Sequence, residues 1–235
     1  MIAGALQHHE LFICRENGGR CKSVEGITWD SAKRLIQTLN PSSVVDVGKV
    51  DFTKLPKDIL GTSLIPYIDD ANETGHRIAL QATENGNCLY NCTSLSLCGD
   101  ESRSNSLRLL VGGKLYFHAE YYATHEVFKQ TAELTEIPQS VLFPVALTTS
   151  GDKALTDGGT RIDALKAEAV ATCKDKQWSS LINMMALASV IGRPVYSLYP
   201  KVNLRFRQLM MTLLKPRRSH TLHLMYAAGS DQNHS

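Results

Sequence analysis

One cysteine of this chain stands where a thiol could act as a nucleophile. The segment Gly86-Asn87-Cys88-Leu89-Tyr90 places Cys88 after a glycine-containing turn, at the start of a run that predicts a helix over residues 88–98 ended by Gly99. The first N–H groups of a helix have no partner inside it, so they favour a thiolate and raise the nucleophilic fraction of the cysteine at neutral pH.

The turn itself offers a second contribution to such chemistry. Backbone N–H groups near Asn85, Gly86 and Asn87 could stabilise the oxyanion that forms when a thiolate attacks an amide carbonyl. A helix start can equally hold a cysteine as a small buried apolar residue, and the pentapeptide alone leaves both interpretations open.

The elements that must position this turn are short strands and amphipathic helices. Residues 78–83 predict a strand that enters the turn, and a longer helix is expected at about 103–124. Gly112-Gly113 inside that helix suggests a point of close packing. Alternating helices and strands indicate an α/β (α+β) chain with a small central sheet flanked by helices. The rest of the chain predicts the following elements. We expect loop over 1–27, a helix from about 28 to 39, a strand at 43–47, an irregular segment at 48–75, a surface excursion at 129–159, helices at 160–174 and 178–191, strands at 195–199 and 221–227, and a helix or broken strand at 204–214.

Composition places the chain among ordinary globular proteins. Of its 235 residues 43% are hydrophobic and 20% charged, with a formal net charge of +2. That balance does not by itself indicate a nucleic-acid partner, although the basic run 215–218 would allow one. No stretch is long and apolar enough for a membrane span, and residues 1–10 make a poor signal peptide. We therefore expect a cytoplasmic or nuclear location and no membrane partner.

The six cysteines predict thiols rather than disulfides in such a compartment. Nothing in the sequence calls for a metal or an organic cofactor, and no C-x-x-C pair supports a zinc site. His8, His9, Cys14 and Cys21 could chelate a metal, but a loop is the preferred interpretation. Cys92, one helical turn after Cys88, is expected to serve core packing rather than to act as a resolving thiol.

The cysteine motif, with Ser94-Leu95-Ser96-Leu97-Cys98-Gly99-Asp100-Glu101 after it, resembles the signature of the OTU (ovarian tumour) cysteine-protease family. The segments 107–122 and 178–195 resemble the helices and the strand that follow in that family. A closer resemblance, to the vertnin-like branch, rests on Ala186–Val190, Tyr196–Pro200, Asn203–Arg205, Lys215–Arg218 and Thr221–Met225. Together these similarities cover about residues 76–229.

The resemblance implies an OTU-like cysteine-protease fold and hydrolysis of ubiquitin isopeptide bonds, with ubiquitin or a ubiquitinated protein as partner. Cys88 would be the nucleophile, a histidine would hold the thiolate and protonate the leaving amine, and an Asp or Asn would orient that histidine. His234 is the candidate for this role. His220 and His223 match structural positions of the family, and solvation or packing explains His118 and His125.

Two departures from the family pattern weigh on this prediction. Asn85 replaces the usual Asp three residues before the cysteine; it can keep the hydrogen bonds of the turn but brings no charge. The histidine usually opens a final strand after the one at 221–227, and we expect that strand to be missing here, so that 76–235 is a C-terminally incomplete OTU-like domain after an uncertain 1–75 extension. The alternative is a catalytically inactive vertnin-like module with a nuclear regulatory or scaffolding role.

Overall fold

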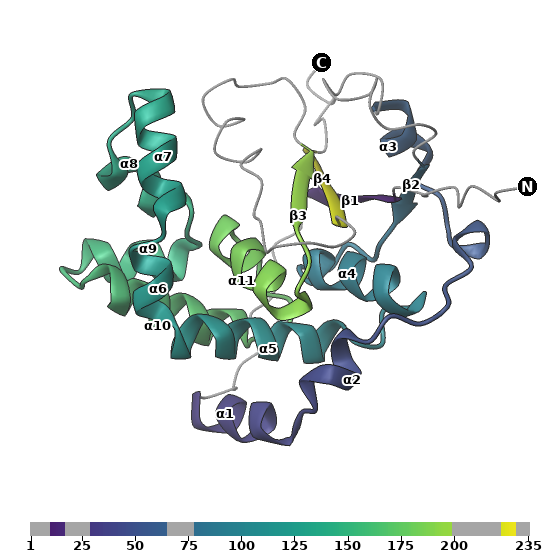
Figure 1. Cartoon of the computed structure of the whole chain (residues 1–235), viewed down its shortest axis with the longest axis horizontal. Helices are drawn as coiled ribbons and strands as arrows, with labels where there is room; N and C mark the ends of the chain where they lie inside the picture. Colours follow the sequence, from purple (N-terminus) through teal and green to yellow (C-terminus); the bar gives the residue numbers. More distant parts are fainter. Residues whose placement is uncertain (1–9, 17–28, 65–77, 199–221, 229–235) are drawn as a thin grey trace, which may run out of the picture.

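The computed structural model describes residues 10–16, 29–64, 78–198 and 222–228 of the chain. Within these residues helices predominate, and four strands form one sheet (Figure 1). Helices and a small sheet therefore occur together, as the sequence predicted. The segment 204–214 lies outside the described residues. None of the described helices is both long and apolar enough to cross a membrane.

The sheet is parallel throughout and has the strand order β2-β1-β4-β3. Parallel strands lie with their carboxyl ends at one edge, and in α/β proteins that edge is where binding sites form. β2 ends there and leads through residues 82–87 to the start of the next helix. The strands are β1 (Glu10–Glu16), β2 (Ile78–Gln81), β3 (Val195–Leu198) and β4 (Leu222–Ala228).

The strand β1 corrects the expectation of loop over residues 1–27. It lies inside the sheet, where Leu11 pairs with Ala79 of β2 on one side and with His223 of β4 on the other. Its conformation is thus set by two neighbours far along the chain, which a local pattern cannot reveal. The predicted strands at 78–83, 195–199 and 221–227 are confirmed by β2, β3 and β4.

The helices lie in layers beside the sheet (Figure 1). α4 and α11 lie next to the sheet, α5 and α10 run side by side behind them, and α1 and α2 pack on the far side of α5. Their bounds are α1 (Trp29–Thr38), α2 (Pro41–Val45), α3 (Ile59–Leu64), α4 (Cys88–Cys98), α5 (Ser104–Phe117), α6 (Ala119–Ala123), α7 (Glu126–Thr135), α8 (Gln139–Val145), α9 (Thr149–Thr156), α10 (Arg161–Thr172) and α11 (Leu181–Ile191), with a 3₁₀ turn, η1 (Phe52–Lys54), between α2 and α3.

Several helix predictions are confirmed and others are wrong. The helices expected at 28–39, 88–98, 160–174 and 178–191 are α1, α4, α10 and α11. The strand expected at 43–47 is wrong, since α2 occupies residues up to Val45. The helix forms because the Asn40 side chain accepts the N–H of Ser42 and Pro41 favours the first helical position.

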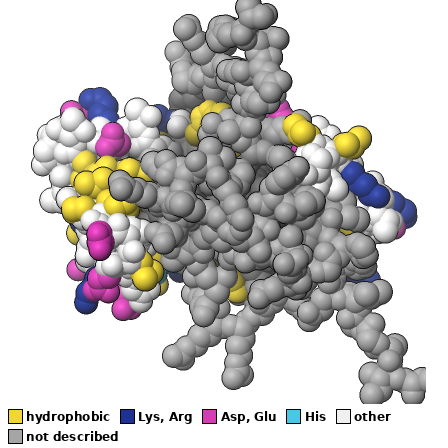
Figure 2. All heavy atoms as spheres, turned by 90° about the horizontal axis from the view of Figure 1, so that it is seen from above, with side chains coloured by type: hydrophobic (Ala, Val, Ile, Leu, Met, Phe, Trp, Pro, Cys, Tyr) yellow, Lys and Arg dark blue, Asp and Glu magenta, His cyan; other side chains and the backbone are white. Residues whose placement is uncertain are grey.

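Two further expectations need correction. The helix expected at 103–124 is divided at His118 into α5 and α6. The excursion expected at 129–159 is largely helical: α7 reaches into it, and α8 and α9 lie within it. Seen from above, hydrophobic side chains gather on the left, where α7 and α8 lie (Figure 2), and Leu134, Val141 and Val145 are exposed there.

The glycine pair of α5 marks a close contact, as expected. A Cβ at Gly112 would lie 2.5 Å from Cys173 Sγ, and one at Gly113 would lie 3.1 Å from Ile36 Cδ1. These approaches bring α10 and α1 onto opposite parts of α5. The core continues through α4 and α11, both of which are buried over most of their length. Burial is expected for α11, which is apolar on nearly every side, whereas α4 also buries the polar residues Asn91, Thr93 and Ser94.

Candidate functional site

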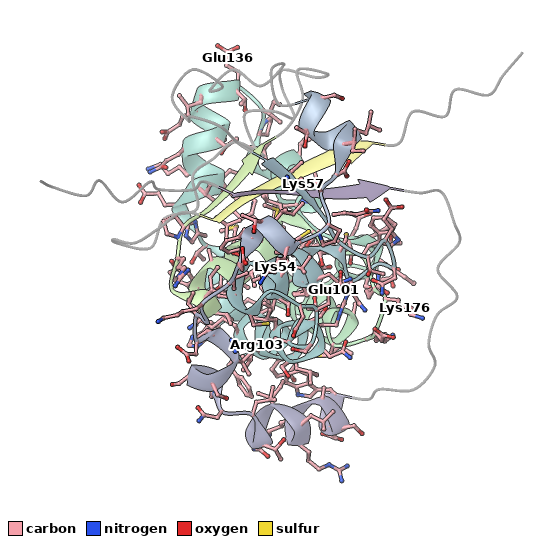
Figure 3. All side chains as sticks on the ribbon, turned by 90° about the vertical axis from the view of Figure 1, so that its right-hand side faces the viewer. Lys54, Lys57, Glu101, Arg103, Glu136 and Lys176 are labelled. Atoms are coloured by element: carbon pink, nitrogen blue, oxygen red, sulfur yellow. The ribbon has the colours of Figure 1, made fainter. Side chains whose placement is uncertain are left out.

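The turn before α4, residues 85–87, is shaped by a glycine in the left-handed region. Gly86 has a φ of 77°, and a Cβ at this position would lie 2.2 Å from the carbonyl oxygen of Lys176. Lys176 itself has a φ of 58°, which is uncommon for a residue with a side chain. Two tight turns thus pack backbone against backbone beside Cys88, and the Lys176 side chain extends to the outside of the molecule (Figure 3).

Asn85 supports the turn with its side-chain oxygen. This oxygen accepts the N–H of Asn87 at 3.1 Å and the Nδ2–H of Asn91 at 3.1 Å, and Asn91 also donates to the carbonyl of Thr83. The turn hydrogen bonds expected of Asn85 are therefore present without a charge. The N–H of Asn87 donates to Asn85 inside the turn, so it is not free to donate to an oxyanion as the sequence predicted.

The Asn87 side chain points away from the helix that it precedes. It makes no cap bond to α4; its Nδ2 donates to Asp175 Oδ1 at 2.7 Å, and its Oδ1 accepts the N–H of Lys176 at 2.9 Å. These bonds join the turn to the loop 173–180 between α10 and α11. Asn87 is buried, with 6% of its surface exposed, and its two partners lie on the exposed part of that loop.

A buried arginine completes this arrangement. Arg108 of α5 is 2% exposed, and its Nη2 donates to the Gly86 carbonyl at 2.9 Å, to Asn87 Oδ1 at 2.5 Å and to the Gln177 carbonyl at 2.8 Å. Its Nη1 donates to the Thr172 carbonyl at 2.9 Å, and the guanidinium lies over the Tyr90 ring, 4.5 Å from the centroid. One cation therefore holds the turn, the end of α10 and the loop 173–180 together.

The role of Arg108 was not predicted from the sequence, although the sequence contains an indication of it. A charged residue lies between Leu107 and Leu110 on the side of the helix expected to be apolar. A charged side chain is seldom buried without partners, so the position of Arg108 indicates that polar groups pack opposite it. Burial lowers the pKa of Arg108, and the neighbouring Tyr90, Asp175 and Cys88 oppose that change.

Cys88 is the first residue of α4, where the sequence placed it. It is 5% exposed and borders the apolar core, while Cys92 one turn later is fully buried, as core packing requires. Its catalytic role stays a prediction, because the geometry fixes the position of the residue and not its reactivity.

The histidines separate into described and undescribed ones. His118 ends α5, and His125 precedes α7, where its Nδ1 accepts the N–H of Val127; burial lowers the pKa of His125. His223 is a residue of β4, the strand that pairs with β1 and β3, and α4 packs against this strand. His220 and His234 lie outside the described residues, so the base proposed for Cys88 stays a prediction.

Cavities lined by described residues include the following two. One of about 550 Å³ is lined by the strand exit that precedes the turn together with acidic residues after α4, and Thr83 N–H donates to Glu101 Oε1 at 2.7 Å beside it. Its lining residues are Pro56, Gln81, Ala82, Thr83, Glu84, Leu95, Asp100 and Glu101.

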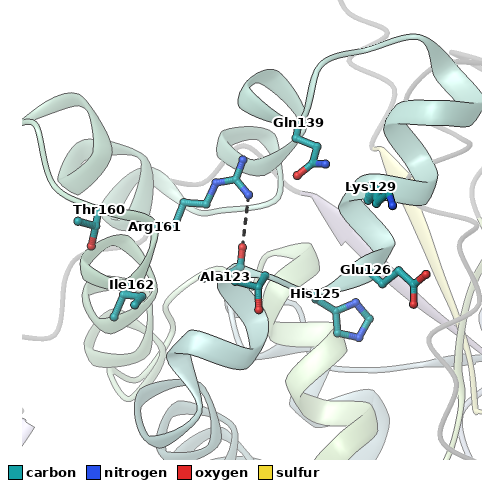
Figure 4. A pocket seen from close by; sticks show the side chains of 9 residues that line it. Ala123, His125, Glu126, Lys129, Gln139, Thr160, Arg161 and Ile162 are labelled. Atoms are coloured by element: carbon teal, nitrogen blue, oxygen red, sulfur yellow. Dashed lines mark hydrogen bonds between the residues drawn. The ribbon is translucent and has the colours of Figure 1, made fainter.

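The other cavity, of about 600 Å³, lies between α6, α7, α8 and the start of α10 (Figure 4). Arg161 reaches across it to the carbonyl of Ala123 at 3.3 Å and also lies over the Phe143 ring. The side chains of Lys129 and Glu126 bring opposite charges to its wall, and none of residues 85–88 lines it. It is therefore separate from the cysteine site.

Metal ligation finds no support in the described part of the chain, where no group of three or more His, Cys, Asp or Glu side chains is gathered. Cys14 has no described side chain, and His8, His9 and Cys21 lie outside the described residues altogether.

Comparison with known proteins defines the class of this domain. The family model "Vertnin, OTU domain" matches residues 79–227, which include the turn, α4, Arg108 and three of the four strands. The chain therefore belongs to the vertnin OTU-domain family, as its sequence motifs indicated.

Individual relatives agree with this assignment. The chain is 28% identical to vertnin of Bos taurus over 77% of its length, 26% identical to vertnin of Homo sapiens over 91%, and 25% identical to vertnin of Danio rerio over 60%. These matches cover 27%, 30% and 21% of the respective relatives, so the chain spans less than a third of their length. No solved structure matches it significantly.

Proposed function

We propose that this chain is an OTU-type cysteine isopeptidase domain that acts on ubiquitin joined to lysine side chains. The observation that supports the proposal most is the presentation of Cys88: a turn with a left-handed glycine, held by a buried arginine, places this thiol at the positive end of α4. Such a position favours a thiolate and supplies N–H donors for an oxyanion.

The proposed reaction follows the usual course for a thiol nucleophile. The Cys88 thiolate attacks the isopeptide carbonyl, the C–N bond breaks, and an imidazole gives its proton to the leaving lysine amine. Water then hydrolyses the thioester and releases the ubiquitin carboxylate. His234 is the sequence candidate for the imidazole, and the cavity lined by Thr83 and Glu84 offers room for substrate beside the turn.

The test is reaction with a ubiquitin probe that carries a thiol-reactive group at its C-terminus. We expect wild type to form an adduct at Cys88, Cys88→Ala to form none, and Cys98→Ala, which removes the cysteine at the other end of the same helix, to react like wild type. A folded wild-type chain that gives no adduct, or one that reacts equally well after Cys88→Ala, contradicts the proposal.

One observation favours a second function, a non-catalytic module with a regulatory or scaffolding role in the nucleus. Cys88 is 5% exposed and packs within the same core as Leu89 and Tyr90, which is the environment of a structural thiol. Under this alternative the folded wild-type chain forms no adduct with the ubiquitin probe, and Cys88→Ser lowers its stability because a packed thiol is replaced by a hydroxyl group. The probe reaction of wild type, together with urea unfolding of wild type and Cys88→Ser, separates the two functions.

A further inference from the structure

We infer that Arg108 is the positioning residue of the Cys88 site: it fixes the turn 85–87 against the loop 173–180 and places a buried positive charge beside the thiol. The inference rests on the proposed function only in taking Cys88 to be a reactive thiol. It concerns a residue of α5 that lies twenty positions further along the chain and touches the site through Gly86 and Asn87.

The planar shape of the Arg108 guanidinium lets it join several segments at once. Its acceptors come from separate segments: Gly86 and Asn87 from the turn, Thr172 from α10 and Gln177 from the loop. A planar fork of donors can bond to several carbonyls at fixed angles, whereas a lysine ammonium cannot reproduce that pattern. Arg108 thereby sets the orientation of the peptide units that lead directly into Cys88.

The positive charge of Arg108 is buried beside Cys88 and can act on it. The acceptors of Arg108 in the described part of the chain are neutral carbonyl or amide oxygens, its stacking partner is a ring face, and no carboxylate of these residues forms an ion pair with it. The Asp175 carboxylate interacts with this charge from the exposed loop, but water is excluded from the guanidinium, so a large part of its field acts on its buried neighbours. That field favours a negative charge nearby.

The negative charge that this field favours must lie on a neighbour of Arg108. Groups that interact electrostatically with Arg108 include Tyr90, Asp175, Cys88 and Cys173. Burial raises the pKa of Tyr90 to about 12 and that of Cys173 to about 12, so both stay neutral near pH 7. Asp175 is exposed and bonds to Asn87. Cys88 is therefore the buried neighbour left to respond to the guanidinium.

The experiment measures how fast each cysteine of the native chain reacts with iodoacetamide from about pH 6 to about pH 9, a range that brackets thiol ionisation. Tandem mass spectrometry of the tryptic peptide 78–103, which carries Cys88, Cys92 and Cys98, assigns the alkylation to each cysteine. The variants are Arg108→Met, which removes charge and fork; Arg108→Lys, which keeps the charge; and Asn87→Ala, which removes one acceptor. Arg103→Met is the matched control, because Arg103 precedes the same helix and, among the described residues, its guanidinium donates to the carbonyls of Val44 and Asp46.

We expect Arg108→Met to slow alkylation of Cys88 near pH 7 about tenfold and to move its rise to higher pH. Arg108→Lys should lose less than Arg108→Met. Cys98 in the same samples, and Cys88 in Arg103→Met, should react as in wild type. A purely structural role for Arg108 would lower the unfolding temperature without moving this pH profile. Where Arg108→Met does not fold, Asn87→Ala provides the comparison, with a smaller shift in the same direction.

Two results would overturn the inference: a Cys88 profile in folded Arg108→Met or Asn87→Ala that matches wild type, or a Cys88 that stays unreactive in the folded wild type up to about pH 9. The ubiquitin probe separates this from the proposed function. A shifted alkylation profile together with no ubiquitin adduct would remove the isopeptidase and keep the positioning role, because the thiol would be activated for some other acceptor.

Discussion

The two ends of α4 are built from the same kinds of residue and have opposite environments. Each end has a glycine at positive φ (Gly86 and Gly99), a cysteine (Cys88 and Cys98) and a nearby arginine. At the start, the cysteine is buried and Arg108 is 2% exposed. At the end, Cys98 is partly exposed and its Sγ lies 3.3 Å from Asp100 Oδ1.

The difference shows what makes one end a candidate site. Arg103, at the far end, donates to the carbonyls of Val44 and Asp46 and so attaches α2 to the start of α5, at a half-exposed position (Figure 3). Arg108 acts on the peptide units that present Cys88, away from water. The residue types are alike, but the cysteine at the start of α4 has a buried arginine and the positive end of the helix beside it, whereas Cys98 has the opposite helix end and the Asp100 carboxylate.

The largest effect should come from Gly86→Ala. The added Cβ would meet the Lys176 carbonyl at 2.2 Å, and both partners are backbone, so neither can move without disturbing its turn. We expect a loss of about 4 kcal/mol or more in unfolding free energy, at the high end for single substitutions. Urea unfolding followed by circular dichroism measures it, and a loss below that of Gly99→Ala would contradict the close packing of the two turns.

Arg108→Met should destabilise the chain next most, by about 3 kcal/mol, because it leaves several buried carbonyls without a donor. Arg103→Met, at the half-exposed end, should lose about 1 kcal/mol, since water can replace its bonds. The comparison is made from urea midpoints with a common slope. Equal losses for the two arginines would show that burial does not distinguish the ends of α4.

Gly99→Ala should lower stability by about 1–2 kcal/mol, the usual penalty of a left-handed conformation for a residue with a side chain. The nearest atom to the new Cβ is Val50 Cγ1 at 3.2 Å, and this side chain can turn away. Thermal unfolding of Gly99→Ala against Gly158→Ala is the matched measurement, because Gly158 also has positive φ and has nothing within 4 Å of a new Cβ.

A pH-dependent effect should arise where the polar network of the site continues into α10. Glu168 is fully buried and accepts hydrogen bonds from Thr148 and Ser180, and burial raises its pKa above the ordinary glutamate value. A raised folded-state pKa gives stability that is present below the unfolded pKa and lost as pH rises through the folded pKa.

Wild type should therefore lose stability relative to Glu168→Gln as the pH rises from the ordinary glutamate range toward neutrality. Unfolding midpoints measured at several pH values check this. Glu133→Gln, an exposed position of α7, serves as the control and should show no such divergence. A difference that shrinks with rising pH would mean that the hydrogen bonds to the carboxylate outweigh its burial.

The smallest effect is expected for Lys176→Gly. Relief of the left-handed conformation should stabilise the turn, and the extra freedom of glycine in the unfolded chain offsets part of that gain, which leaves about 0.5 kcal/mol. Lys174→Gly, an exposed lysine of the same loop without positive φ, should destabilise instead. Differential scanning calorimetry resolves both, and a loss for Lys176→Gly would show that its side chain contributes more than its conformation costs.

The sequence by itself determined the local features of this protein. The period of apolar residues and the glycines at their ends placed α4, α10, α11 and the strands β2, β3 and β4, and the cysteine motif identified the OTU class that the family comparison bears out. These features depend on residues close together in the chain, where propensity and capping decide the conformation.

The conformation of β1 and the position of Arg108 depend on contacts between segments that are far apart in the chain. β1 became a strand because two distant strands flank it. Arg108 joined the site of Cys88 because helix packing brings α5 under the turn and the loop 173–180. Burial and long-range hydrogen bonds depend on residues far apart in sequence, so no local pattern could have shown that Arg108 bonds to the turn before Cys88 and to the loop 173–180.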